Sequence, residues 1–314
     1  MTASGQAGAG RRVAVPGGTA AETGQGERAS GGVGSRGAVP GGAGSRRAAG
    51  GATMGLRFDV NLSILFTDLP LLERPAAAAE AGFTAVEMWW PFDGPTPSDR
   101  DLRALRSAIE DAGVQLVALN FDAGDMANGD RGMLTQTDRF LANVDVAVGL
   151  AGRLGCRILN ALYGNTAPGS ARTRDVDAGH RRVAVANLAH AAKRAADIGA
   201  TVVVEALNSH ENPRYPLTSS HQALEVIDQV GMENVKLLAD LYHLHRMGED
   251  VLGLLDTQAH RIGHVQVADD PGRGYPGSGR MPYTEIFNKL GTYEGHVGLE
   301  YRHEGPGAFD WRNG

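Results

Sequence analysis

RIGHVQVADDPGRGYPGSG, residues 261–279, combines a strand-like run with a loop rich in glycine and proline. Val265 and Val267 alternate with His264 and Gln266, so one face of the run is apolar and the other is polar. In a barrel, alternate strand residues face the surrounding helices and the barrel interior. The pattern therefore predicts a strand whose His264 and Gln266 point into a barrel, just before a loop at its mouth.

Strand-like runs and helix-like stretches alternate along most of the chain. The expected strands cover residues 58–66, 85–90, 115–121, 157–164, 201–208, 235–243, 262–269 and 296–302. The clearest expected helices cover residues 69–82, 99–113, 139–155 and 180–199. This alternation predicts parallel strands joined by right-handed crossovers. Eight such units in a domain of this length predict an α/β fold, the closed (β/α)8 or TIM barrel.

The last helix of this barrel is weakly encoded. Residues 305–314, GPGAFDWRNG, are few and glycine-rich, and glycine is a poor helix former. We therefore expect a partner chain to cover the final layer of the barrel, as in a homodimer.

Residues 1–53 differ in composition from the rest of the 314-residue chain. They are mainly Gly, Ala, Ser and Arg, with almost no large apolar side chains. Such a segment cannot bury enough surface to offset its ordering entropy, which predicts a disordered extension. The expected organisation is this extension over 1–53 and one barrel domain over 54–314. A start codon assigned too far upstream is an alternative explanation of the extension.

Charge and composition exclude several classes of function. Residues 1–53 hold six Arg and two Glu, a net +4, so the overall −6 leaves −10 on residues 54–314. A domain this acidic is poorly suited to binding a nucleic-acid backbone. No run is long enough to span a bilayer. The single cysteine, Cys156, has apolar neighbours and predicts a cytoplasmic chain without disulfides.

Three carboxylates end apolar runs in the same way as Gln266 does. Glu205 follows TVVV, Asp240 follows KLLA and Glu300 follows HVGL. The carboxyl ends of barrel strands meet at one mouth, where barrel enzymes build their active sites. Three carboxylates gathered in a buried mouth would repel one another unless a cation joins them. With the Gln266 carbonyl the donors are all oxygen, which predicts Mg²⁺ or Mn²⁺ bound by Glu205, Asp240, Gln266 and Glu300.

Other polar residues are expected near this mouth. His243, three residues after Asp240, is a candidate for a hydrogen bond to bound substrate. Arg273 lies on the glycine-rich loop, where its guanidinium could clamp a substrate carboxylate. His264 lies deeper and is expected to orient a ligand of the metal. Asn61 and Glu87 are weaker candidates on the first two strands.

Seven segments together carry a resemblance to a known family. They are RFDVNLSILF, GFTAVEMWWPFD, NFDAGDMANGDRG, LTSSHQALEVIDQVG, DLYHLHRM, IGHVQVADDPGRGYPGSG and GLEYR. With these motifs the chain resembles the hydroxypyruvate isomerases, within the xylose isomerase-like TIM barrels that also include endonuclease IV. The resemblance covers nearly all of residues 54–314.

The resemblance implies an isomerase that interconverts hydroxypyruvate and tartronate semialdehyde through an enediolate, with a small-molecule substrate. It implies that Glu205 and Glu300 bind the metal and act as the catalytic acid–base pair. Asp240 and Gln266 match the other metal positions, and His243 and Arg273 match substrate-contacting positions. Where the family has a tryptophan after AGD, this chain has Met126, which leaves the exact substrate open.

Three alternatives remain open at the sequence level. A related keto-sugar or inosose isomerase, epimerase or dehydratase would use the same metal site. A DNA-repair endonuclease of the same fold would need a histidine-rich zinc site and a basic face, which the charge and the oxygen donors oppose. A barrel that binds without catalysis is disfavoured, because all four ligand positions are present.

Overall fold

The computed structural model describes residues 55–166 and 178–313. Eight parallel strands close into one barrel in sequence order, with β1 pairing both β2 and β8. The strands are β1 (Arg57–Asn61), β2 (Ala85–Met88), β3 (Gln115–Asn120), β4 (Ile158–Asn160), β5 (Thr201–Glu205), β6 (Val235–Asp240), β7 (Ile262–Val267) and β8 (His296–Leu299). The predicted TIM barrel is confirmed. The predicted disordered extension, residues 1–53, lies outside the described residues.

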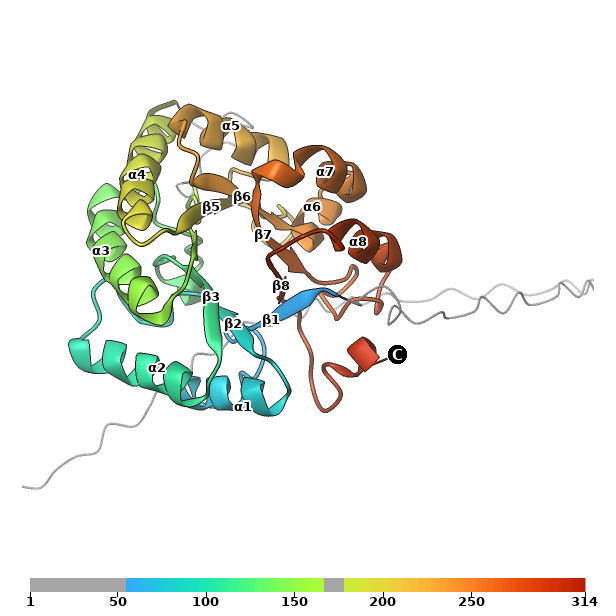
Figure 1. Cartoon of the computed structure of the whole chain (residues 1–314). Helices are drawn as coiled ribbons and strands as arrows, with labels where there is room; N and C mark the ends of the chain where they lie inside the picture. Colours follow the sequence, from blue (N-terminus) through green and yellow to red (C-terminus); the bar gives the residue numbers. More distant parts are fainter. Residues whose placement is uncertain (1–54, 167–177, 314) are drawn as a thin grey trace, which may run out of the picture. The chain divides into compact units, whose positions relative to one another are not determined.

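Helices surround the barrel, as Figure 1 shows. They are η2 (Leu71–Glu73), α1 (Arg74–Glu80), α2 (Asp99–Asp111), η3 (Met126–Asn128), α3 (Thr137–Leu154), α4 (Ala178–Ala196), α5 (Ser220–Val230), α6 (Leu241–Arg246), α7 (Val251–Gln258), η4 (Ala259–Arg261), α8 (Tyr283–Leu290) and η5 (Asp310–Asn313). Local signals set several boundaries. Ser98 caps α2 by accepting the N–H of Asp101, and α3 ends at Gly155 with φ 68°.

The strands are shorter than the apolar runs that predicted them. The run expected to reach residue 208 ends as a strand at Glu205, although Ala206 and Leu207 are also buried. Apolar residues therefore continue past the strand, because the first residues of the following loop still pack in the core.

Alternation along β7 is as the sequence predicts. His264 and Gln266 are 2% and 3% exposed, while Val265 and Val267 are fully buried. The side chains of His264 and Gln266 both reach Glu87 on β2, across the barrel interior. The interior therefore contains a polar cluster, and the apolar core lies between the strands and the helices.

The C-terminal segment covers the layer that the weak last helix leaves open. Only the short turn η5 follows β8 within the described residues, and Figure 1 shows it at the C-terminus. The Trp311 ring lies 5.7 Å from Phe58 of β1 and 6.0 Å from Phe287 of α8, centroid to centroid. Phe309 packs edge-on against Phe83 at 4.8 Å. Aromatic side chains of the same chain therefore cover this layer, and the expected covering by a partner chain stays an untested prediction. An uncovered final layer is no longer an argument for the homodimer, which also stays an untested prediction.

Within the described residues, no helix combines the length and the apolar character needed to cross a membrane.

Candidate metal and substrate site

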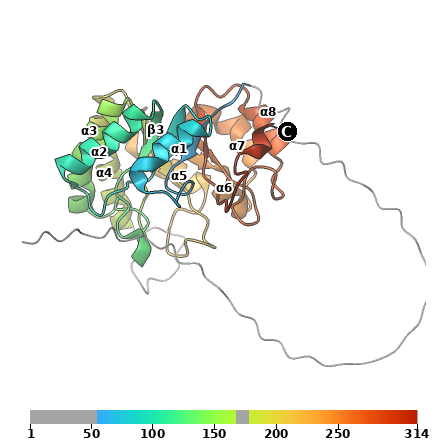
Figure 2. The ribbon, with the colours of Figure 1, turned by 90° about the horizontal axis from the view of Figure 1, so that it is seen from below.

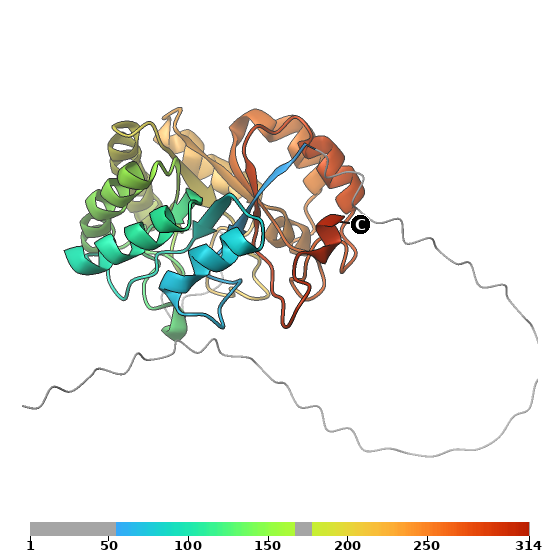
Figure 3. The same cartoon turned by 60° about the horizontal axis from the view of Figure 1, so that its bottom comes forward.

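The carboxyl ends of four consecutive strands bring the predicted ligands together. Glu205 and Asp240 are the last residues of β5 and β6, Gln266 pairs with Asp240 in the β6–β7 register, and Glu300 follows β8. All four are at most 5% exposed. Figures 2 and 3 show that the loops after β3 and β5 extend on one side of the barrel. These loops form the rim of the site.

His243 joins two of the predicted ligands. Ligand atoms of Glu205, Asp240 and His243 all lie within 4.8 Å of one another. The backbone N–H of Asn208 donates to His243 Nδ1 at 3.2 Å, which leaves Nε2 to carry the proton of the neutral ring. Burial, and then the nearby Arg273 and Arg246, hold the pKa of His243 well below its usual range. His243 is therefore a neutral imidazole beside two carboxylates, and its Nε2–H can donate a hydrogen bond to substrate but cannot bind a metal while it keeps this proton.

The two ends of the Gln266 side-chain amide differ, since one is hydrogen-bonded and the other is free among the described residues. Its Nε2 donates to Glu87 Oε1 at 2.8 Å, while its buried Oε1 has no hydrogen-bond partner within the described residues. Burial of an unpaired carbonyl oxygen costs free energy unless another partner satisfies it. A divalent cation held by Glu205 and Asp240 would be such a partner, so the donors fit an oxygen-binding metal.

Glu300 is held by several donors. Its Oε1 accepts from Asn61 Nδ2 at 2.9 Å and from Trp89 Nε1 at 2.7 Å, and its Oε2 is ion-paired with Arg273 Nη2. Glu300 is not part of the group formed by Glu205, Asp240 and His243 among the described residues. Its carboxylate is turned to Arg273, whose positive charge neutralises it.

The glycine-rich loop that follows β7 is organised by Asp269. This fully buried carboxylate accepts the backbone N–H groups of Gly277, Gly279 and Met281 at 2.8–3.0 Å. A Cβ at Gly279 would lie 2.2 Å from a backbone oxygen, so only glycine fits there. The fold of this loop holds Arg273 at φ 56°, a conformation uncommon for residues with a side chain.

Arg273 reaches into the site rather than over it. The side chain is buried, and besides Glu300 it lies 3.7 Å from Asp240 Oδ2. The sequence predicted Arg273 as a clamp for a substrate carboxylate. In the structure its guanidinium contacts carboxylates of the protein itself.

The carboxyl groups of the site resist ionisation. Burial, and then Glu300 and Asp240, raise the pKa of Glu205 well above its usual range. Burial raises the pKa of Asp240 to about 6, against the lowering effect of Arg273. Burial, with Asp240 and Glu87, raises the pKa of Glu300 to about 8. Three such groups can ionise together only with a compensating positive charge, which a divalent cation supplies.

Some residues of the site were missed in the sequence or given too little weight. Asn160, at the end of β4, donates to Glu205 Oε2 at 2.8 Å. The signal was present, because Asn160 is a polar residue ending an apolar run, as Glu205 is. Asn61 and Glu87 were weak candidates, yet Asn61 bonds both Glu87 and Glu300 at 2.9 Å. The bond from Trp89 Nε1 to Glu300 was also missed, since no sequence pattern reveals where an indole N–H will donate.

A second buried cluster lies inside the barrel. Asp59, Glu87 and His264 place ligand atoms within 4.8 Å of one another. His264 Nε2 lies 2.6 Å from Glu87 Oε2, in keeping with the predicted orienting role, since Glu87 also holds Gln266. Burial, and then Glu87, raise the pKa of Asp59 well above its usual range. Asp59 therefore favours its neutral form, and Glu87, bonded by three donors, favours its ionised form.

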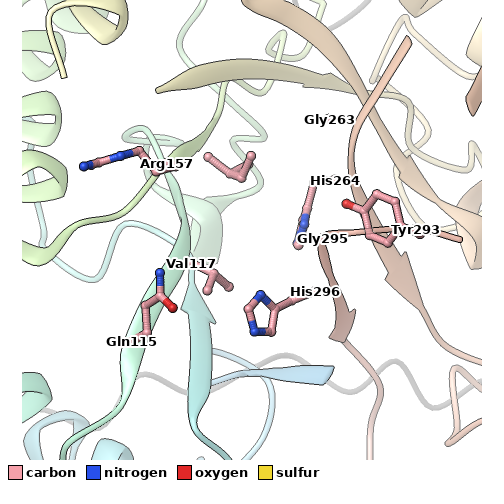
Figure 4. Close-up of a pocket in the computed structure, with 9 residues that line it drawn as sticks. Gln115, Val117, Arg157, Gly263, His264, Tyr293, Gly295 and His296 are labelled. Atoms are coloured by element: carbon pink, nitrogen blue, oxygen red, sulfur yellow. The ribbon is translucent and has the colours of Figure 1, made fainter. Parts of the chain in front are cut away.

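The cavity in Figure 4 is not the candidate metal and substrate site formed by Glu205, Asp240, Gln266 and Glu300. It measures about 150 Å³ and is lined by Gln115, Gly263 and His296, which stand at the starts of β3, β7 and β8. It therefore opens at the amino ends of the strands, opposite the carboxylates.

Comparison with known proteins connects this geometry to described families. A family model described as xylose isomerase-like TIM barrel matches residues 75–314. A Streptomyces coelicolor protein named "Putative hydroxypyruvate isomerase" is 53% identical over 270 residues, covering 81% of this chain and 95% of the relative. Hydroxypyruvate isomerase of Escherichia coli is 34% identical over 252 residues, covering 79% and 93%. The resemblance inferred from the sequence motifs is confirmed.

Two further relatives differ in their names. The 2-oxo-tetronate isomerase of Pectobacterium atrosepticum is 33% identical over 254 residues, covering 79% of this chain and 93% of the relative. A crystal structure titled AP endonuclease, family 2, from Brucella melitensis is 34% identical, with a TM-score of 0.72 over 80% of this chain and 94% of that chain.

Proposed function

This chain belongs to the xylose isomerase-like TIM barrel family, and from that premise we propose that it interconverts hydroxypyruvate and tartronate semialdehyde (2-hydroxy-3-oxopropanoate). Relatives at 53% and 34% identity bear the name hydroxypyruvate isomerase, which supports an isomerase. The proposal depends on one observation. Oxygen donors from four adjacent strands converge at the barrel mouth, and the carbonyl of Gln266 has no partner of its own among the described residues.

Glu205, Asp240, Gln266 and Glu300 would hold a divalent cation, Mg²⁺ or Mn²⁺. When bound, the cation would act as a Lewis acid on the oxygens of the substrate and make the neighbouring C–H group more acidic. Arg273 is ion-paired with Glu300 and lies 3.7 Å from Asp240 Oδ2, so its single positive charge offsets only part of the negative charge of the site.

Glu205 and Glu300 are the proposed acid–base pair. One carboxylate removes a proton from C3 of hydroxypyruvate, and the other carboxyl group delivers a proton to C2 of the resulting enediolate. The proton of the C3 hydroxyl is transferred to the oxygen on C2. Oxidation of C3 then equals reduction of C2, so the reaction needs no external redox partner. Neighbouring carboxyl groups with raised pKa values suit this exchange, since one must be ionised while the other is protonated.

A 2-oxo-tetronate isomerase is the second candidate, supported by the relative with that name at 33% identity. Its substrate is one carbon longer and is also a 2-oxo acid. Related keto-sugar or inosose chemistry would use the same ligands without needing a carboxylate subsite. An endonuclease activity is disfavoured, because each potential metal group among the described residues contains only one histidine.

The test is proton NMR of the full chain, loaded with Mg²⁺, with hydroxypyruvate in deuterated water. Loss of the C3 methylene signal, formation of tartronate semialdehyde and solvent deuterium at C2 are expected, and excess chelator should stop all three. Glu300→Gln is the inactive control. Turnover of a keto-sugar but of neither 2-oxo acid would refute the proposal.

A further inference from the structure

Two guanidinium groups stand at the rim of the site with no ionic partner among the residues that the structure describes. Arg131 belongs to the loop after β3 and Arg214 to the loop after β5. Arg131 donates to Asn212 Oδ1 at 3.0 Å and to the carbonyl oxygens of Met126 and Asp130 at 3.1 and 2.6 Å. Arg214 Nη2 donates to the carbonyl oxygen of Gly129 at 3.1 Å. All these acceptors are uncharged.

Neither guanidinium has a carboxylate within 4.0 Å in residues 55–166 and 178–313. Both also keep unused donors. Within the same ranges, Nη2 of Arg131 and Nε and Nη1 of Arg214 make no hydrogen bond. Two half-buried cations with free N–H groups form a site for an anion.

The two guanidiniums contact one loop segment, and Arg131 is linked to the site through Asn212, which bonds Asn208 beside His243. Both contact the segment 126–130, Arg131 through Met126 and Arg214 through Gly129. Burial, and then the positive charges of Arg214 and Arg273, lower the pKa of Arg131. Gly129, with φ 95°, allows the close approach, because a Cβ there would lie 3.2 Å from Arg214 Nη2.

Charge is therefore divided between the floor and the rim of the site. The floor holds Glu205, Asp240 and Glu300, and Arg273 is already engaged with the last two. A substrate carboxylate would be repelled by these groups, whereas the rim offers unneutralised guanidiniums.

We propose that Arg131 and Arg214 bind the carboxylate of a 2-oxo acid substrate, and so orient its C2 and C3 toward the acid–base pair on the floor. The inference rests on the proposed function and assigns the substrate-carboxylate role, predicted from the sequence for Arg273, to two other residues. It also accounts for specificity, because a neutral sugar would leave both guanidiniums unpaired.

The experiment uses the full chain loaded with Mn²⁺ and the variants Arg131→Gln, Arg214→Gln and Arg131→Lys. Arg106→Gln, at an arginine on α2 that pairs with Glu110, is the matched control. The KM for hydroxypyruvate and the calorimetric Kd of tartronate, a substrate-like dianion, are measured for each protein. Since hydrogen bonds to charged groups contribute about 1.5–3 kcal/mol, each Gln variant should raise both constants about 10- to 100-fold. The kcat and the Mn²⁺ affinity should change less than about threefold, and Arg131→Lys should recover part of the loss.

Two results would overturn the inference. One is a KM and a tartronate Kd within about twofold of wild type in both Gln variants. The other is a loss of Mn²⁺ affinity parallel to the rise in KM, which would indicate a structural role for these loops.

Failure of the proposed function is a separate result. If the wild-type protein converts neither hydroxypyruvate nor 2-oxo-tetronate, that function falls. Tartronate binding by the variants still decides whether Arg131 and Arg214 form an anion site.

Discussion

Gln266 of β7 donates an Nε2 proton to Oε1 of Glu87 on β2, 2.8 Å away within the barrel. This single bond decides which end of the amide is free, because the other end, Oε1, has no partner among the described residues. Glu87 is itself fixed by Asn61 and His264. A carboxylate that is not itself a proposed metal ligand therefore sets the orientation of a metal ligand.

Glu87→Gln should weaken metal binding while leaving all four proposed ligands in place. An amide at position 87 can donate as well as accept, so Gln266 is no longer held with its carbonyl free. Loss of such an outer partner typically lowers metal affinity by about 10- to 100-fold. Titration with Mn²⁺, followed by electron paramagnetic resonance, measures the effect. Glu80→Gln on the exposed end of α1 is the control, and equal affinities for the two variants would refute the orienting role.

Glu205→Gln and Glu300→Gln should each lower kcat by about 10²- to 10⁴-fold, the usual contribution of a positioned acid or base. Each change keeps the size of the side chain and removes a titrating group. The measurement is hydroxypyruvate turnover by NMR at saturating metal, with folding checked by circular dichroism. Glu110→Gln on α2 should behave as wild type. A variant that retains a tenth or more of the activity would remove that glutamate from the proposed pair.

The contribution of Asp240 and Glu300 to the stability of the metal-free protein should fall as pH rises. Asp240 has a pKa of about 6 in the folded chain against an ordinary 3.8, and Glu300 has about 8 against 4.5. The folded state thus binds more protons than the unfolded state, so their contribution to the free energy of unfolding is present at about pH 4 and is lost toward pH 8.

Urea unfolding between pH 4.5 and 8, with chelator present, measures this slope. Asp240→Asn should flatten it, because the amide does not titrate. Added Mn²⁺ should stabilise the wild-type protein more at pH 8 than at pH 5, since binding requires ionised ligands. An Asp240→Asn variant whose slope equals that of the wild type would contradict the raised pKa of Asp240.

Trp311→Ala should lower the free energy of unfolding by about 2 to 3 kcal/mol, near the low end for a large aromatic side chain because Trp311 is only partly buried. The substitution removes contacts with Phe58 and Phe287 and the Nε1 hydrogen bond to Tyr301. Leu72→Ala, at an exposed position, is the control and should cost less than about 0.5 kcal/mol. Size-exclusion chromatography of Trp311→Ala tests the predicted homodimer. If the aromatic face serves only to close the barrel, exposing this face in the variant should not produce a dimer.

The order of elements could be predicted because the strands alternate with amphipathic helices and because polar residues end apolar runs. Asn160, Glu205 and Asp240 all carry this local signal. The contacts could not be predicted in the same way. That Arg273 would bond Glu300 depends on how Asp269 folds the intervening loop, and that Trp311 would cover Phe58 depends on pairing between distant segments. Such contacts are set by the closed barrel and are absent from any short window of sequence.

Pairing of β1 with β8 also has a consequence for the order of events during folding. Asn61 and Glu300, which the closed barrel joins by a hydrogen bond, are 239 residues apart in the chain. During synthesis β1 cannot pair with β8 until nearly the whole domain has been made. Closing so long a loop is also entropically costly. On refolding, recovery of activity should therefore lag behind recovery of helix, and a nascent chain ending before β8 would be catalytically silent.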